Sequence, residues 1–163
     1  MTKHLLFVII LFLLCYRCSC EDYNNIEICN NSNQTIYFTQ GINYPDTTLE
    51  NNPNYIDSKG NRTYIAGSSY NRIFPFKTNF TTFHPYKSEF RYLYDTLMVF
   101  LFDGYIIDHT IPEIIEKNYL VLQRYDLSLS DLEKLNWKIY YPPTEAMKDM
   151  KMWPPYKKEG YDD

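Results

Sequence analysis

The chain has 163 residues, of which 45% are hydrophobic and 22% charged, a globular composition that fits one domain and argues against a two-domain enzyme. Lysine and arginine total 16 against 20 acidic residues, so the formal net charge of −4 offers no basic surface for a nucleic acid. Aromatic residues reach 18%, with 17 tyrosines, and such residues favour pleated, half-buried surfaces. The composition therefore predicts a mainly β protein and excludes nucleic acid as a partner.

Residues 1–19 have the layout of a signal peptide. They contain Lys3 and Arg17 but no acidic residue, and an unbroken apolar run covers Leu5–Leu14. This run has the length of a signal-peptide hydrophobic region and is too short for a transmembrane helix. A buried strand or core helix is the alternative for such a run. We expect residues 1–19 to direct export and exclude them from the fold.

The residues Cys15-Tyr16-Arg17-Cys18-Ser19-Cys20-Glu21-Asp22 resemble the end of a bacterial lipoprotein signal peptide. The resemblance implies cleavage after the small residue Ser19 and lipidation of Cys20, the new first residue. Glu21 and Asp22 are similar to the acidic export signal of Bacteroidetes surface lipoproteins. The resemblance thus implies a chain that is secreted across the inner membrane and lipid-anchored, at the outer membrane or the cell surface. With Cys20 acylated, Cys29 is the one thiol left, and no disulfide framework is expected.

Two blocks of the mature chain are similar to a group of small Bacteroidetes lipoproteins of unknown function. The first, at 120–143, contains Arg-Tyr-Asp-Leu-Ser-Leu-Ser-Asp-Leu-Glu-Lys-Leu-Asn-Trp and ends in Tyr-Tyr-Pro-Pro. The second extends from Asn30-Asn31-Ser32-Asn33 through Tyr44-Pro45-Asp46-Thr47. The resemblance implies an exported, compact β-rich body, and it implies no catalytic residues.

The mature sequence predicts a tether at 20–25, a single β-rich domain at 26–143 and a polar C-terminal tail at 144–163. Alternating or apolar runs predict strands, with turn residues between them. These runs lie at 26–29, 35–39, 62–66, 120–126 and 137–141, with edge pieces within 73–94 and a short strand near Tyr55 inside the loop 43–61. The run 96–102 is almost continuously apolar, as in a central strand covered on both faces. We expect an antiparallel β-sandwich-like domain with two short helices.

The first helix is expected at about 110–119. Thr110 has the character of an N-cap, with Pro112 in the first turn and Glu113 at the third helical position. Asp103-Gly104 is a turn signal that ends the strand before it.

The second helix is expected after Ser128. Asp131 three residues later completes a capping box, and Leu127 and Leu132 form a hydrophobic staple. Trp137 is then expected to open the last strand. We predict structural roles for Ser128, Asp131 and Trp137.

Catalytic and metal-binding patterns are weak in this sequence. Only His84 and His109 remain in the mature chain, and neither lies in a nucleophile-elbow pattern. A metal site from Cys29, His84, His109 and an aspartate lacks the paired short spacings typical of such sites. We therefore expect no catalytic residues, no metal and no cofactor.

The tyrosines beside loops are the candidates for binding. A platform for stacking on glycans could be built from them, because a tyrosine ring has an apolar face and a polar tip; the alternative is that they cover half-buried strand surfaces. The binding residues that we predict are Tyr44, Asp46 and Tyr55. Arg124 is expected to form a structural ion pair with Asp126 or a neighbouring acid.

These features predict a non-enzymatic, lipid-anchored binding or accessory domain of a bacterial envelope, with a protein or glycan partner. A small hydrolase that uses His84 or His109 is one alternative. An accessory subunit that pairs through an exposed edge strand is another. The third is a secreted eukaryotic domain, N-glycosylated at Asn30, Asn33, Asn61 and Asn79.

Overall fold

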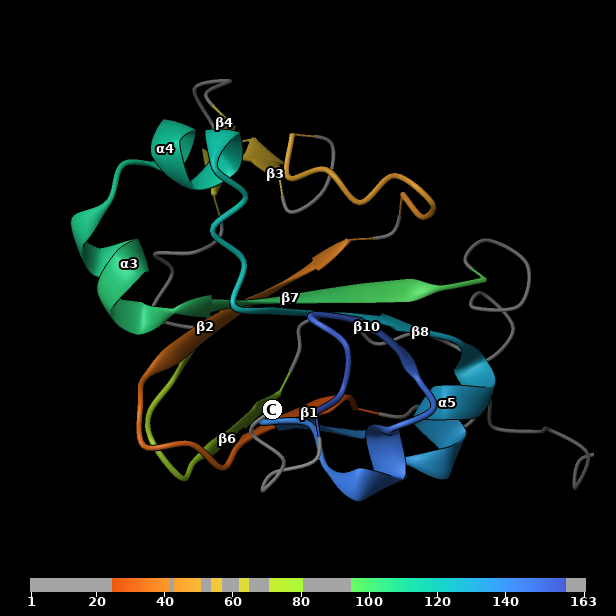
Figure 1. Cartoon of the computed structure of the whole chain (residues 1–163). Helices are drawn as coiled ribbons and strands as arrows, with labels where there is room; N and C mark the ends of the chain where they lie inside the picture. Colours follow the sequence, from red (N-terminus) through yellow and green to blue (C-terminus); the bar gives the residue numbers. More distant parts are fainter. Residues whose placement is uncertain are drawn as a thin grey trace, which may run out of the picture.

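The computed structural model describes residues 25–41, 43–50, 54–56, 62–64, 71–80 and 95–157 (Figure 1). These residues form a mainly β, sandwich-like domain, which confirms the predicted fold class. The strands are β1 (Glu27–Asn30), β2 (Ile36–Gly41), β3 (Asn54–Ile56), β4 (Arg62–Tyr64), β5 (Arg72–Ile73), β6 (Thr78–Phe80), β7 (Leu97–Asp103), β8 (Gln123–Leu127), β9 (Lys138–Tyr141) and β10 (Lys151–Trp153). The helices are α3 (Gly104–His109), α4 (Pro112–Lys117), α5 (Leu129–Lys134) and the 3-10 helix η2 (Glu145–Met147).

Two sheets make up the sandwich. The larger is five-stranded and antiparallel, in the order β10-β8-β7-β2-β5, and β7 lies at its centre as predicted. The smaller has the order β6-β1-β9, and β1 is antiparallel to β6 but parallel to β9. A separate hairpin joins β3 to β4. Strands β1 and β2, which are consecutive in the chain, therefore belong to different sheets, and the turn between them connects the two layers.

Strand β7 is apolar throughout because each of its faces has its own core. Leu97, Val99 and Leu101 pack inward against the smaller sheet and α5. Met98, Phe100 and Phe102 point the opposite way, into a second cluster. We call this second side of the five-stranded sheet the outer face. Figure 1 shows α3 and α4 on this side and α5 with β1 and β6 on the other.

The turn between the sheets is organised by Asn30, which is 1% exposed. Its Nδ2 donates to the carbonyl oxygens of Gln34 at 2.8 Å and Phe74 at 3.2 Å. Its Oδ1 accepts from the amide of Ser32 at 3.0 Å. Buried and fully engaged, this side chain is a poor glycan acceptor in the folded protein, although it begins a glycosylation sequon.

The segment after β7 is a helix, so the predicted turn at Asp103-Gly104 is wrong. Asp103 caps α3 instead, because its Oδ1 accepts from the amides of Tyr105 at 2.7 Å and Ile106 at 3.1 Å. A Cβ at Gly104 would lie 2.7 Å from the carbonyl oxygen of Thr35, which explains the glycine. The described residues thus hold three α-helices rather than two.

The predicted capping box at Thr110 is also wrong. Thr110 is the C-cap of α3, and α4 begins at Pro112 after Ile111, whose side chain makes no capping bond. Proline at the first position supplies the fixed φ that a helix start needs, so the helix forms without the box.

The start of α5 is as predicted. Ser128 Oγ accepts from the amide of Asp131 at 3.2 Å, and the Asp131 carboxylate accepts from the Ser128 amide at 3.0 Å. Asn136, at φ 50°, follows the C-cap Leu135. Beyond the helix, the Asn136 amide donates to the Glu133 carbonyl oxygen and the Trp137 amide to that of Leu132. Trp137 lies in this left-handed turn at φ 63°, half-buried, so the expectation that it opens the strand is corrected.

Residues 144–157 belong to the fold, which corrects the predicted polar tail for this part of 144–163. Met147 is fully buried and Met150 nearly so, both in the inner core. Strand β10 pairs with β8 along the edge of the larger sheet, with Lys151 opposite Asp126 and Trp153 opposite Arg124. The C-terminal segment thereby adds a strand beside the candidate site.

Candidate functional site

Strands β8 and β10 place a polar strip on the outer face. Tyr125 and Met152 point into the inner core, so the residues on either side of them in each strand point outward. Register puts Arg124 beside Trp153 and Asp126 beside Lys151. On the other side of β8, Arg124 lies opposite Phe100 and Asp126 opposite Met98 of β7, and both of these β7 residues belong to the apolar cluster of the outer face.

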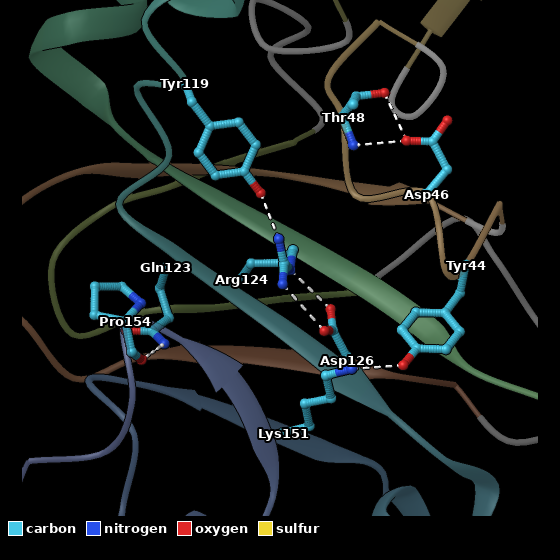
Figure 2. Close-up of polar contacts among 9 residues, drawn as sticks. All are labelled: Tyr44, Asp46, Thr48, Tyr119, Gln123, Arg124, Asp126, Lys151 and Pro154. Atoms are coloured by element: carbon cyan, nitrogen blue, oxygen red, sulfur yellow. Dashed lines mark hydrogen bonds and ion pairs between the residues drawn. The ribbon is translucent and has the colours of Figure 1, made fainter.

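Arg124 is held by three hydrogen bonds (Figure 2). Its Nε donates to Asp126 Oδ1 at 2.9 Å and its Nη2 to Asp126 Oδ2 at 3.2 Å. Its Nη1 donates to the hydroxyl of Tyr119 at 2.7 Å. The Asp126 side chain is fully buried and that of Arg124 is 13% exposed. The predicted ion pair is therefore confirmed, and it fixes the guanidinium in one orientation.

Electrostatics keep Arg124 charged. Burial alone lowers the pKa of Arg124, but the hydrogen bonds with Asp126 and Tyr119 outweigh it and raise the pKa above its usual value. The outer face therefore carries a permanent cation whose partners are in place without a ligand.

Tyr119 reaches Arg124 because of how α4 ends. Tyr119 follows the C-cap Asn118 and has a φ of 49°. The amides of Tyr119 and Leu120 donate to the carbonyl oxygens of Glu116 and Ile115, respectively. The Tyr119 ring meets Trp153 edge-on, with the ring centroids 5.3 Å apart. Trp153 is 42% exposed, so this pair offers an aromatic surface directly beside the fixed guanidinium.

A second cation is held one row further along. Lys151 Nζ donates to the hydroxyl of Tyr44 and lies 4.8 Å from the centre of its ring. The hydrogen bond to Tyr44 raises the pKa of Lys151, so the ammonium stays charged. We call Tyr44, Tyr119, Arg124, Lys151 and Trp153 the outer-face cluster.

A groove of about 650 Å³ adjoins this cluster, between residues 47–50 and α4. Tyr119 lies in its wall, so the groove and the cluster share a residue. The groove is also lined by Leu49, Glu50, Glu113, Glu116 and Lys117. Three of these residues are glutamates and one is a lysine, so the groove is net acidic and does not extend the cationic surface of the cluster.

Two of the three predicted binding residues have a described environment. Tyr44 belongs to the outer-face cluster and its ring packs against the outer core. Asp46 Oδ1 accepts from the amide and hydroxyl of Thr48 at 2.9 and 2.7 Å, which shapes the loop (Figure 2). Tyr55 lies in β3, and its side chain falls outside the described residues, as does Cys20.

His109 ends α3, stacks on Tyr105 and approaches its carbonyl oxygen, with Nδ1 at 2.8 Å. His84 is outside the described residues. Within the described ranges, no group of three or more His, Cys, Asp and Glu side chains could hold a metal ion. The helices of the same ranges include none that is long and apolar enough to span a membrane.

Sequence reasoning missed Lys151, Trp153 and Tyr119. The first two lie in the segment taken for a tail, where the apolar positions Met147, Met150 and Met152 were the available signal. Tyr119 had no signal, because its position depends on how α4 ends. Comparisons of the chain with models of known protein families, with curated proteins and with solved structures found no match.

Proposed function

We propose that this protein is a lipid-anchored envelope lipoprotein whose β-sandwich is a non-enzymatic binding domain, and that the outer-face cluster binds an acidic glycan. The observation that carries the proposal is the fixed Arg124 guanidinium beside the exposed Trp153. A surface whose charged groups are already held in position loses little entropy when a ligand binds.

The chemistry of the cluster matches sugars that carry carboxylates. The indole of Trp153, 42% exposed and braced edge-on by the ring of Tyr119, offers an apolar surface for the C–H face of a sugar ring. Lys151 supplies a positive charge for a ligand carboxylate, whereas the charge of Arg124 is balanced by Asp126, so Arg124 contributes fixed N–H donors. A protein partner would use the same groups, and the experiment below separates the two.

The binding test is calorimetric titration of the mature domain with uronic-acid oligosaccharides and with their carboxyl-reduced counterparts. Trp153→Ala should abolish binding of the acidic sugars, and Lys151→Met should weaken it, because the first removes the stacking surface and the second a charge. Phe76→Ala is the matched control, since Phe76 is an exposed aromatic residue on the β5–β6 turn. Equal binding of acidic and reduced sugars would remove the role of charge, and no binding at all would reject a glycan ligand.

The lipid anchor rests on the signal-peptide layout and on Cys20. Metabolic labelling with a palmitate analogue should mark the wild-type chain and not Cys20→Ala. Label that persists in Cys20→Ala would reject that residue as the anchor. A mass loss on deglycosylation, with no lipid, would favour the eukaryotic alternative.

A further inference from the structure

The start of β1 is the part of the described fold nearest to Cys20 along the chain. From Cys20 to Asn25 there are five residue steps, and β1 begins two residues later at Glu27. Five residue steps cover at most about 17 Å, even when fully extended. With Cys20 anchored in a membrane, as the proposed function holds, the start of β1 must stay close to the lipid surface.

Side chains suited to that surface surround the start of β1. Glu27 lies opposite Phe80 of β6 and opposite Lys138 of β9, and its amide donates to the carbonyl oxygen of Trp137 at 2.9 Å. Phe80 is 54% exposed, so its ring is accessible at this end of the sheet. Lys138 and Glu27 form an ion pair at 3.2 Å, so the strand start carries no unbalanced charge. Tryptophan and lysine, the residue types of Trp137 and Lys138, are typical of the membrane–water interface.

We propose that this end of the smaller sheet, formed by Glu27, Phe80, Trp137 and Lys138 and here called the β1 end, rests on the bilayer that holds the lipid anchor. Phe80 enters the headgroup region, and Lys138 lies among the lipid phosphates. This inference rests on the proposed function, because the bilayer is brought to the β1 end by the anchor at Cys20.

The opposite end of β6 points away from the bilayer in this arrangement. The β5–β6 turn carries the exposed Phe74 and Phe76, and the carbonyl oxygen of Lys77 accepts from the amide of Asn30, the last residue of β1. Strand β6 therefore has an exposed phenylalanine on either side, Phe80 at the β1 end and Phe76 in the turn that precedes the strand.

Net charge favours the tether, rather than electrostatic attraction, as the force that brings the domain to the membrane. Acidic residues outnumber basic ones in the whole chain, and removal of residues 1–19 takes away Lys3 and Arg17 but no acid. Such a domain has no general attraction for an anionic leaflet. Its contact with lipid is therefore confined to the part that the tether brings close, which is the β1 end.

The chain contains 2 tryptophans, one at the β1 end and one in the outer-face cluster, and these can test the contact optically. The mature Cys29→Ser protein is coupled through Cys20 to a maleimide lipid in phosphatidylcholine vesicles, so that attachment does not depend on natural acylation. Some of the lipids carry a nitroxide on the headgroup. In Trp153→Phe, Trp137 fluorescence should be quenched by these lipids, whereas in Trp137→Phe the fluorescence of Trp153 should be quenched by aqueous acrylamide alone.

Two further variants in the Trp153→Phe background link the quenching to Phe80. Phe80→Ser should reduce quenching of Trp137 by the lipid, and Phe76→Ser should leave it unchanged. Equal quenching of both tryptophans by the nitroxide lipids, or no effect of Phe80→Ser, would overturn the contact. These results judge the β1 end alone, while the palmitate labelling described above judges the natural anchor.

Discussion

Arg124 and Asp126 face the same side of β8 and form a two-pronged ion pair, with both side chains largely removed from solvent. The pair is the rigid base of the outer-face cluster, because the same guanidinium also binds the hydroxyl of Tyr119 from α4. It therefore joins the sheet to the helical layer and holds a cation next to Trp153.

Asp126→Asn should destabilise the fold strongly. Removing one partner leaves the Arg124 charge poorly paired in a buried place, which costs about 3 kcal/mol of unfolding free energy. Urea unfolding measures this loss. Glu113→Gln is the control, an exposed carboxylate on α4 whose replacement should change the free energy by less than about 0.5 kcal/mol. A thermodynamically silent Asp126→Asn would mean that the ion pair does not form in solution.

Leu49→Ala should lower stability as a core substitution does. Leu49 is 1% exposed and packs in the hydrophobic cluster that contains Met98 and Phe100, although it lies in a segment that the sequence predicts as a loop. Truncating a buried leucine costs about 3 kcal/mol, measured as a lower thermal midpoint. Thr47→Ala, two residues earlier and half-buried, should stay within about 0.5 kcal/mol of the wild type. Equal effects of the two changes would show that the loop is not packed on the sheet.

Two substitutions in the segment around α5 should lower the free energy of unfolding by different amounts. Ser128→Ala removes the helix cap and should cost about 1 kcal/mol. Trp137→Ala should cost about 2 kcal/mol, less than the ~3–5 kcal/mol typical of a fully buried tryptophan, because Trp137 is half-buried. Chemical denaturation of the two variants gives both values. If Trp137→Ala left stability unchanged but abolished ligand binding, this segment would be a recognition surface.

Stability should fall in alkaline solution. Burial raises the pKa of Tyr125 well above its ordinary value of 10.0, and burial also raises the pKa of Tyr37 and of Tyr141. Above about pH 10 the unfolded chain therefore loses phenolic protons that the folded chain keeps, so the unfolded state gains stability as the pH rises. The contribution is fully present below pH 10 and is lost above it.

Thermal midpoints measured from pH 8 to pH 11 test this expectation. Tyr125→Phe should begin with lower stability, since the Tyr125 hydroxyl donates to the Tyr140 carbonyl oxygen at 2.8 Å, but its midpoint should fall less steeply above pH 10. A wild-type curve parallel to that of Tyr125→Phe would contradict the assignment to this residue.

The sequence predicted correctly those elements whose structure is determined by residues that are close together in the chain. The apolar run of β7 and the capping box of Ser128 and Asp131 are of this kind, because their cause lies within a few residues. The Arg124–Asp126 pair was predictable for the same reason, since residues two apart in a strand share a face.

The remaining features depend on contacts that are distant in sequence. Asp103-Gly104 is a turn signal by itself, but the close approach to the Thr35 carbonyl makes it a helix start. Strand β10 has only three residues, and it becomes a strand by pairing with β8. The outer-face cluster therefore emerged only when α4, β8 and β10 were placed together.

A ligand that lies against Trp153 can be observed through the fluorescence of that residue. In Trp137→Phe, where Trp153 is the remaining tryptophan, titration with uronic-acid oligosaccharide should shift its emission to shorter wavelength with saturation. In Trp153→Phe, Trp137 should show no change, because the start of β9 lies away from the cluster. A saturable change in Trp137 alone, or no change in either variant at concentrations where calorimetry detects binding, would contradict a binding site at the outer-face cluster.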